Sequence, residues 1–373
     1  MNIQSMTFAE MCGDGLFKDG DWIESKDQDQ NGDVRIIQLA DIGIGKFLDK
    51  SSRFMTLEKT RELNCTYLQE GDILIARMPD PIGRACILPA MNQVCVTAVD
   101  VCIIRLDSDE VDSRWLMHKI NSSGFNHQIL QFVTGTTRKR ISRGNLSKLM
   151  IDIPPLDEQK RIADILDKAE EIKKKTQESE DLRDIFNHSL FIDIFGDPVI
   201  NPMNWKEEKI EDLCDKIFAG GDVPKDSLSK EYTAEYTIPI YSNGKAEKSL
   251  YGFTSIPKVD KDSVTVSARG TIGFPVVRKA PFYPIIRLIV ATPNTEKVNL
   301  QYLCSAISYL VFGKGGSSIP QLTVPMLKSR TVLVPPIELQ EKFSRILESV
   351  RNVPKSTELA ENNSLSIVQQ ILN

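Results

Sequence analysis

Residues 151–166 read IDIPPLDEQKRIADIL, and residues 332–347, which lie 181 positions further along the chain, read VLVPPIELQEKFSRIL. Both stretches contain an apolar run, a Pro-Pro pair, an acidic residue, a glutamine and the start of an amphipathic helix. A proline pair cannot continue a strand ladder, and it suits the turn before a helix, where acidic residues favour the helix dipole. The repetition predicts two copies of one domain, each of which ends in a strand, a turn and a helix.

The similarity extends upstream of the proline pairs. Three blocks align in the same order, with small shifts between blocks that indicate loop insertions. The aligned blocks are 72–88 with 262–278, 111–120 with 298–307, and 135–156 with 316–337. In the first pair a strand pattern precedes a glycine turn, PIGR in one copy and TIGF in the other. The ordered blocks indicate a diverged internal repeat.

The segment after each proline pair has a helical pattern. From Leu156 to about Ile194 there is no Pro or Gly until FGDP (195–198), which predicts one helix of about 38 residues and roughly 57 Å. Two antiparallel helices paired as a coiled coil would bury both apolar stripes, and packing against an ordinary core is the alternative. The predicted coiled-coil positions are Ile162, Ile165, Leu166, Ala169, Ile172, Leu182, Phe186, Phe343, Ile346, Leu347 and Val350.

The chain of 373 residues exceeds the size of one ordinary core, which favours two domains. The predicted fold class is α+β, with two similar mixed α/β domains separated and joined by long antiparallel coiled-coil helices in a pseudo-twofold repeat. Pro354 interrupts the second helix, because the residue before a proline is disfavoured in the helical region. The predicted boundaries are 1–155 and 197–336 for the globular domains, and 156–196 and 337–373 for the helices.

Composition restricts the class of protein. A hydrophobic content of 41% and a charged content of 26% are typical of soluble globular proteins, and no apolar stretch reaches the length of a membrane-spanning helix. The opening MNIQSMTFAE lacks the pattern of a signal peptide, so we expect a cytoplasmic location. The seven cysteines form no CxxC pair and are expected to be reduced, buried thiols. With a net charge of −5, any nucleic-acid binding requires local patches or charged partners.

No catalytic motif is complete. NPMNW (201–205) has only the first two letters of the Asn/Asp-Pro-Pro-aromatic loop of adenine methyltransferases, and GKGGSS (313–318) has the composition of a phosphate loop in the wrong order. The three histidines lack metal-ligand spacing, and no G-x-S-x-G is present. We therefore expect no catalytic residue, no metal and no cofactor, which favours a binding or scaffolding role.

Positive charge collects in residues 135–148, GTTRKRISRGNLSK, which contain no acid and whose hydroxyl and amide side chains suit phosphate contacts; a solvated loop is the alternative. Arginines also flank the glycine turns, and YSNGK (241–245) offers an asparagine beside a lysine. Arginine and asparagine can read guanine and adenine in the major groove. The candidate DNA-binding residues are Arg77, Arg84, Arg138, Lys139, Arg140, Arg143, Asn243, Lys245, Arg269, Arg278 and Lys279.

These segments resemble the DNA-specificity subunit of type I restriction-modification systems. The two repeated stretches carry the resemblance, IYSNG, ARGTIG and LFIDIFGDPVINPMNW support it, and it covers essentially the whole chain. It implies two target-recognition domains, each bound to one half of a bipartite site in double-stranded DNA, with the helices as a spacer. It also implies two adenine methyltransferase subunits and two translocating nuclease (restriction) subunits as partners, and no catalysis by the chain itself.

The second copy departs from the first in one respect. It has IPQ where the first copy has RKR, so a phosphate-binding role for Arg138, Lys139 and Arg140 does not transfer to it. Two other functions stay open: a DNA-reading subunit of another phage-defence or modification complex, and a protein-interaction scaffold that works through its coiled coil. Salt-dependent DNA binding separates the scaffold from the other two, because phosphate contacts release counterions.

Overall fold

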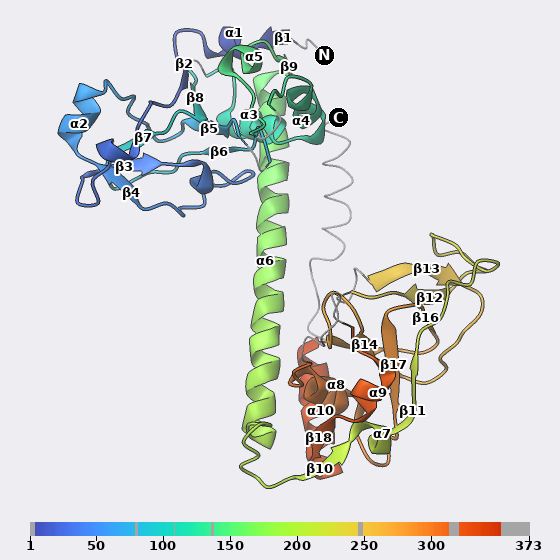
Figure 1. Ribbon diagram of the computed structural model, residues 1–373. Helices are drawn as coiled ribbons and strands as arrows, with labels where there is room; N and C mark the ends of the chain where they lie inside the picture. Colours follow the sequence, from blue (N-terminus) through green and yellow to red (C-terminus); the bar gives the residue numbers. More distant parts are fainter. Residues whose placement is uncertain are drawn as a thin grey trace. The chain divides into compact units, whose positions relative to one another are not determined.

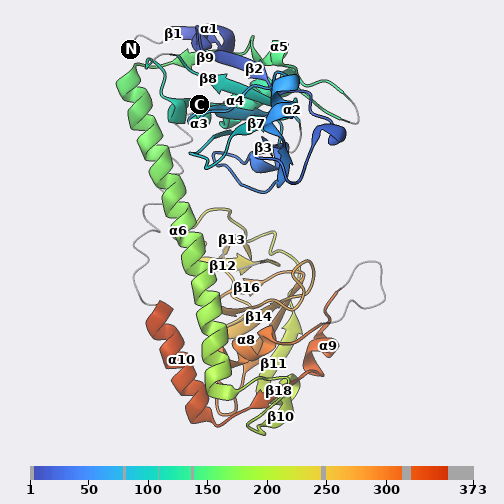
Figure 2. The ribbon, with the colours of Figure 1, turned by 90° about the vertical axis from the view of Figure 1, so that its left-hand side faces the viewer.

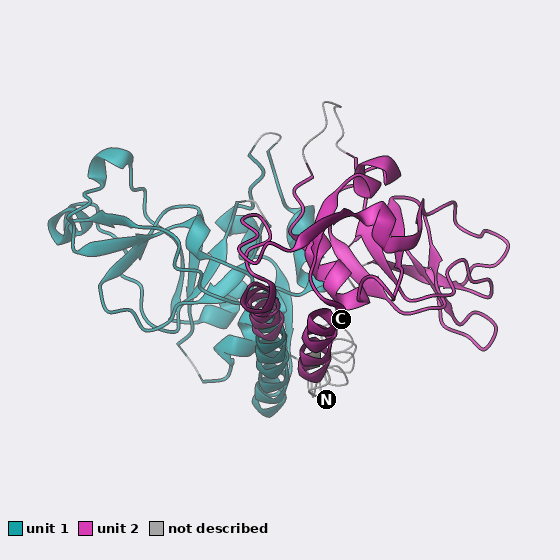
Figure 3. Cartoon of the chain, turned by 90° about the horizontal axis from the view of Figure 1, so that it is seen from below, with its two compact units in different colours: residues 1–177, 356–373 teal, residues 178–355 magenta. Residues whose placement is uncertain are grey.

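The computed structural model describes residues 4–78, 81–107, 109–135, 138–244, 249–312 and 321–351 (Figure 1). The chain divides into two compact units, and the division falls between Gln177 and Glu178 (Figure 3). It lies inside helix α6 (Leu156–Phe195), which is 40 residues long and so spans about 60 Å. The long helix predicted after the first proline pair is confirmed.

The described residues of unit 1 form three small sheets. The strand orders are β1-β9, β2-β8-β5-β6 and β4-β3-β7. The strands are β1 (Gln4–Thr7), β2 (Leu16–Asp19), β3 (Val34–Ile37), β4 (Arg53–Met55), β5 (Ile73–Ala76), β6 (Ala85–Ile87), β7 (Cys95–Thr97), β8 (Val101–Arg105) and β9 (Met150–Ile153). The helices are α1 (Phe8–Cys12), α2 (Leu57–Glu62), α3 (Ser113–Ile120), α4 (Ser123–Gln131) and α5 (Arg143–Leu146).

Unit 2 repeats this topology. Its strand orders are β10-β18, β11-β17-β14-β15 and β13-β12-β16. The strands are β10 (Lys206–Lys209), β11 (Cys214–Ala219), β12 (Ile238–Tyr241), β13 (Leu250–Thr254), β14 (Ser263–Ser267), β15 (Pro275–Arg278), β16 (Tyr283–Pro284), β17 (Leu288–Pro293) and β18 (Thr331–Val334). The helices are α7 (Ile210–Leu213), α8 (Leu300–Ser308), α9 (Val324–Lys328) and α10 (Ile337–Arg351). Strand by strand, the pairing is the same in the two units, so the predicted repeat is confirmed.

The repeat has a one-residue shift that the sequence alignment missed. In unit 1 the amide of Gly83 donates to the carbonyl of Ala76, and in unit 2 the amide of Gly273 donates to that of Ser267, both over 2.8 Å. Ala76 is therefore equivalent to Ser267, whereas the gapless alignment pairs it with Val266. The turn between the strands is one residue longer in unit 1. Both glycines have φ above +80°, which L side chains rarely adopt.

The glutamine of the first repeated stretch is a buried tie. Gln159 is 1% exposed and lies in the first turns of α6. Its Oε1 accepts a hydrogen bond from the amide of Asp112 (2.8 Å), and its Nε2 donates to the carbonyl of Pro154 (2.9 Å). Asp112 caps the start of α3. Gln159 thereby fixes the start of one helix to the proline turn before another.

The second repeated stretch contains the same tie. Gln340 is 0% exposed, accepts from the amide of Asn299 (2.8 Å) and donates to the carbonyl of Pro335 (2.7 Å). Asn299 caps α8, the equivalent of α3. An unpaired polar group inside a core costs about 1–3 kcal/mol, so the two glutamines close a network that no apolar residue could close. This network gives a physical reason for the sequence repetition.

Four of the predicted coiled-coil residues belong to domain cores. Ile162 and Leu166, near the start of α6, pack in the main core of unit 1. Phe343 and Leu347 of α10 pack in the main core of unit 2, with Phe191 from the end of α6. For these four the alternative of core packing holds, because a three-four apolar spacing serves either purpose, and a coiled-coil role for them stays a prediction.

The end of α6 and helix α10 lie side by side and antiparallel within unit 2 (Figure 2). The ring of Phe343 meets those of Phe191 and Phe195 at centroid distances of 5.8 and 5.3 Å, both close to perpendicular. Such edge-to-face pairs add to the energy of apolar burial. The antiparallel pairing of the two helices is thus confirmed where it forms part of the core of unit 2.

The remaining predicted coiled-coil residues are less buried. Leu182 and Phe186, in the middle of α6, are 66% and 38% exposed in the part of the chain that the structure describes. The half-buried members are Ile165, Ala169, Ile172, Ile346 and Val350. The second piece of the second helix, with Pro354, lies outside the described residues, so coiled-coil pairing along the middle of α6 stays a prediction.

Candidate nucleic-acid interface

Three chain segments meet at one end of the four-stranded sheet of unit 1. They are the residue after β5, the residue before β8 and the residues before α5. The amide of Arg77 donates to the carbonyl of Asp100 (2.9 Å), and the amide of Ile141 donates to the carbonyl of Arg77 (3.1 Å). We call this arrangement the Arg77 junction.

Unit 2 contains the same junction with the same backbone hydrogen bonds. The amide of Ala268 donates to the carbonyl of Arg287 (2.9 Å), and the amide of Leu322 donates to the carbonyl of Ala268 (2.9 Å). We call it the Ala268 junction. The equivalence of Ile141 and Leu322, on which the sequence alignment relied, is confirmed. A fixed backbone frame that presents different side chains is a common design for recognition sites.

The side chain of Arg77 is structural. It is 1% exposed, its Nε lies 3.1 Å from Asp19 Oδ1, and its other nitrogens donate to the carbonyls of Val99 and Ile141. Burial lowers the pKa of Arg77, and the Asp19 carboxylate opposes that effect. The prediction that Arg77 contacts DNA is wrong, because its guanidinium is enclosed by protein groups.

The basic run of unit 1 surrounds this junction and is exposed. Arg140 lies 3.7 Å from Asp100, and Arg143 lies 3.8 Å from Asp19. Burial raises the pKa of Asp19, although three arginines lower it. Arg138 and Lys139 are also exposed, beside the undescribed residues 136–137. The structure places these four cations where a phosphate backbone can reach them, and their contact with DNA stays a prediction.

Arg84 is held by the protein in a way the sequence did not indicate. It is half-buried, and its guanidinium donates to four backbone carbonyls at 2.7–3.3 Å. The acceptors belong to Leu39, Ile42, Met78 and Pro81. These bonds use the donors that a guanine contact would need, so the position of Arg84 argues against direct base contact.

Arg278 and Lys279 lie at the end of the β14–β15 hairpin that is opposite its glycine turn. Arg278 is 8% exposed, donates to Ser249 and stacks over the ring of Tyr241 at 3.9 Å. Lys279 is exposed and pairs with Asp262 at 2.7 Å. The length of the hairpin separates these two residues from its turn and from Arg269, and their contact with DNA stays a prediction.

Arg269 belongs to the Ala268 junction. Its Nε and Nη2 both donate to Gln321 Oε1, at 3.1 and 2.6 Å, so the guanidinium is held in one orientation. The amide of the Asn243 side chain donates to the carbonyl of Arg269 (2.6 Å), which brings a second predicted residue to the same place. Lys245 lies outside the described residues. Thus the junction of unit 2 gathers two of the predicted DNA-binding residues.

Sequence reasoning missed four residues of the two junctions: Asp19, Asp100, Arg287 and Gln321. Asp19, Asp100 and Arg287 lie in none of the motifs that were singled out, and Gln321 is the last residue of IPQ, which was noted only for its lack of positive charge. The one signal that could have found them is the internal repeat, once its strands are aligned by their pairing rather than by letters. That alignment matches Asp19 with Ala219 and Asp100 with Arg287.

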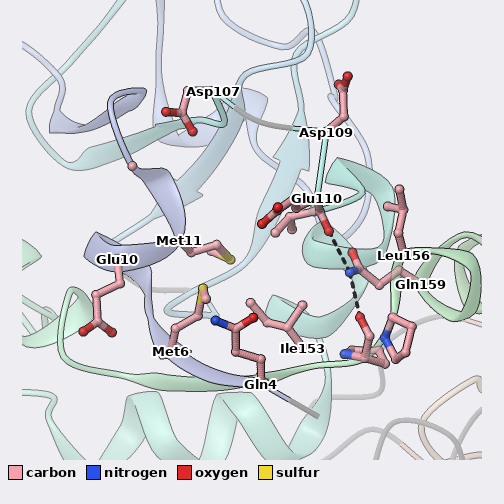
Figure 4. Close-up of a pocket in the computed structure, with 14 residues that line it drawn as sticks. Gln4, Met6, Glu10, Met11, Asp107, Asp109, Glu110, Ile153, Leu156 and Gln159 are labelled. Carbon is pink, nitrogen blue, oxygen red and sulfur yellow. Dashed lines mark hydrogen bonds between the residues drawn. The ribbon is translucent and has the colours of Figure 1, made fainter. Parts of the chain in front are cut away.

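A cavity of about 620 Å³ lies beside the proline turn of unit 1 (Figure 4). Carboxylates of Glu10, Asp107, Asp109 and Glu110 stand around it, and Gln159 forms part of its wall. Negative charge at this density repels a phosphate backbone. The cavity is therefore excluded as part of a DNA interface.

The described residues offer no obvious reaction chemistry. Among them, no three His, Cys, Asp or Glu side chains converge as a metal site would require. The cysteines there are free, and burial raises the pKa of Cys12 and Cys86 to about 12, so these thiols stay protonated at neutral pH. The same part of the chain contains no helix that is long and apolar enough to span a bilayer.

Comparison with known proteins agrees with this geometry. The model of the type I restriction modification DNA specificity domain matches residues 6–182 and 202–366, one match per repeat. The chain therefore belongs to this family, as the resemblance predicted. It is a specificity subunit with two target-recognition domains, the part of a type I restriction-modification system that performs no catalysis.

Individual relatives give the same result. Two Mycoplasma pneumoniae proteins named as type I specificity subunits are 27% and 30% identical over 272 and 261 residues. These matches cover 71% and 66% of this chain, and 72% and 75% of the relatives. A crystal structure of a type I restriction-modification S subunit from M. genitalium has a TM-score of 0.67 at 17% identity, with 100% of this chain and 95% of that one covered. The last similarity shows a shared fold.

Proposed function

We propose that each unit reads one half of a bipartite site in double-stranded DNA, with its junction turned to the nucleic acid. One observation carries the proposal: the two units share a backbone frame, while the side chains at the two junctions differ. The pattern of backbone hydrogen bonds is the same in the two units and the side chains on it differ. This fits a subunit that uses one backbone frame to read two different DNA sequences. In this proposal Arg138, Lys139, Arg140 and Arg143 serve unit 1, and Asn243 and Arg269 serve unit 2.

The domain boundaries predicted from sequence are retained as part of the proposal. Residues 1–155 and 197–336 are the two recognition domains, and 156–196 and 337–373 are the spacer helices. The spacer role is supported by α6, whose two ends belong to two different cores. A rigid helix anchored at both ends transmits any change in its own length to the domains that it joins.

The spacer role predicts a change in the DNA site. Insertion of one helical turn in the exposed middle of α6, between Lys174 and Leu182, lengthens the helix by about 5.4 Å. The two half-sites should then be separated by one or two additional base pairs, because base pairs are spaced about 3.4 Å apart. Mapping of methylated adenines in cells that carry the altered system checks this. An unchanged spacing contradicts the spacer role.

We further propose a complex with two adenine methyltransferase subunits and two restriction subunits, in the cytoplasm. Membership of the family supports this class of partner. Affinity purification of the chain from its host, with quantitative mass spectrometry, tests the stoichiometry. We expect an adenine methyltransferase at about twofold molar excess over this chain.

Salt dependence tests DNA binding in the assembled methyltransferase complex. The logarithm of the binding constant should fall linearly with the logarithm of the salt concentration, since phosphates bound by the protein release their counterions. Replacement of Arg138 and Lys139 by Ala should reduce the slope by about 2 and weaken binding to all sequences alike. The control is Lys168→Ala, which removes an exposed charge of α6. Slopes that do not differ between these variants contradict the assignment of the basic run, and a wild-type complex without salt dependence favours a scaffold.

A further inference from the structure

We infer that the position held by Asp100 in unit 1 and by Arg287 in unit 2 selects a base in each half-site. The inference rests on the proposed DNA-reading function and extends it to one pair of residues. Arg287 would require a guanine in the half-site of unit 2. In the half-site of unit 1, Asp100 would disfavour guanine and would accept a hydrogen bond from the amino group of cytosine.

The two residues occupy the same place in the frame. The carbonyl of Asp100 accepts from the amide of Arg77, and the carbonyl of Arg287 accepts from the amide of Ala268, each over 2.9 Å. Each also directly precedes the equivalent strand, β8 or β17. The two residues therefore hold equivalent positions in the strand pairing, but Arg287 has a positive φ that Asp100 does not share, so the two units differ here in backbone conformation as well as in side chain.

The chemistry at this position is opposite in the two units. The side chain of Asp100 is 28% exposed and faces Arg140 at 3.7 Å, with Asp19 part of the same group of charges. Arg287 is exposed and has Arg269 as a neighbour in its junction. A guanidinium donates two hydrogen bonds to O6 and N7 of guanine, whereas a carboxylate repels these acceptors and accepts from N4 of cytosine.

Within the described part of the chain, the side chain of Arg287 makes no interaction that would give it a role in holding the fold together. Among the described residues its side chain makes no ion pair or hydrogen bond, in contrast to the buried Arg77 of unit 1. Its backbone has φ +71°, a conformation that a long side chain rarely adopts. A strained and exposed arginine costs stability, and strain of this kind collects at functional sites.

Its neighbours are arranged to support base reading. Gln321 holds the Arg269 guanidinium through two hydrogen bonds, so one arginine of the junction is already oriented. Leu322 and Ala268 are buried, 1% and 3% exposed, and their backbone hydrogen bonds join the segments that carry Gln321, Arg269 and Arg287. The junction thus carries two arginines on a hydrogen-bonded backbone, one of them already oriented, which suits a guanine-containing half-site.

The test uses the complete complex with its methyltransferase. Methylated sites are mapped in cells for the wild-type chain, for Arg287→Asn and for Lys297→Asn. Asparagine tolerates a positive φ, so Arg287→Asn removes the guanidinium without adding strain. Lys297→Asn removes one positive charge at the opposite end of β17 and serves as the matched control.

We expect Arg287→Asn to relax a guanine requirement at one position of one half-site, with roughly 10-fold to 100-fold weaker binding to the original site. The complex that contains Lys297→Asn should methylate the same sequence as the wild-type complex. Arg287→Lys should keep the salt slope but weaken the guanine preference, since lysine lacks the planar two-donor geometry of arginine. Asp100→Asn should relax a position in the other half-site.

Two kinds of failure are distinguishable. If the Arg287→Asn complex is folded and methylates the original sequence without relaxation, the inference is overturned while the DNA-reading function stands. The inference is also overturned if both half-sites relax. If the wild-type complex shows no salt-dependent DNA binding, the proposed function itself fails, and the inference fails with it.

Discussion

Unit 1 has an ion pair between the buried Arg77 and the half-buried Asp19 where unit 2 has two alanines. Asp19 and Arg77 lie at positions that the strand pairing makes equivalent to Ala219 and Ala268. Both members of the pair are exchanged together, and the backbone hydrogen bonds around them are unchanged. The difference teaches that the frame of the fold depends on strand pairing and on Gln159 and Gln340, while the junction side chains are free to vary.

The largest effect is expected from breaking the ion pair of unit 1. Asp19→Ala leaves the Arg77 guanidinium buried without a counter-ion, and such a change costs about 3–5 kcal/mol. The double variant Asp19→Ala, Arg77→Ala copies the unit 2 arrangement and should recover at least half of that loss. Hydrogen exchange of unit 1 peptides measures each free energy of opening. If the loss in the double variant equals the sum of the losses in Asp19→Ala and Arg77→Ala, the two residues do not act as a pair.

The second effect concerns the tie that both units share. Gln159→Ala and Gln340→Ala each leave a buried amide and a buried carbonyl unpaired, at a cost of about 2–3 kcal/mol. The two losses should be similar in size, and each should be confined to its own unit. Glu158→Ala and Glu341→Ala are adjacent controls with effects near zero, because surface charges contribute little. A loss of stability in only one of the two units would mean that the glutamine no longer has the same role in both.

The smallest effect is a pH dependence that arises from Asp19, which unit 2 replaces with Ala219. Burial raises the pKa of Asp19 above the ordinary carboxyl value of about 3.9. Between these two values the folded state binds more protons than the unfolded state, so the contribution of Asp19 to stability falls as pH rises through this window.

The double variant Asp19→Ala, Arg77→Ala supplies the test of this sign. It lacks the titrating group, so the stability of wild-type unit 1 relative to the variant should decrease as pH rises from about 4 towards neutrality. Hydrogen exchange at several pH values, corrected for the intrinsic exchange rate, measures the difference. Parallel pH profiles for the two chains would refute the assignment.

The sequence was sufficient for the repeat, the long helix and the proline turns, because these depend on local patterns that recur. It was insufficient for Arg77, whose burial depends on Asp19, a residue of a distant strand. It was also insufficient for Ile162 and Phe343, since an apolar stripe has the same spacing in a coiled coil and in a core. Among the candidate interface residues, Arg287 was missed because it follows no motif and precedes a buried strand.

Helix α6 also determines where two such proteins could exchange domains. Its first turns are built into one core and its last turns into another, while side chains such as Leu182 between them are largely exposed. A genetic crossover in that middle segment would leave both cores intact. Each residue gained or lost there rotates the following helix by about 100°. New DNA specificities could thus arise by joining existing halves, provided that the crossover preserves the helical phase.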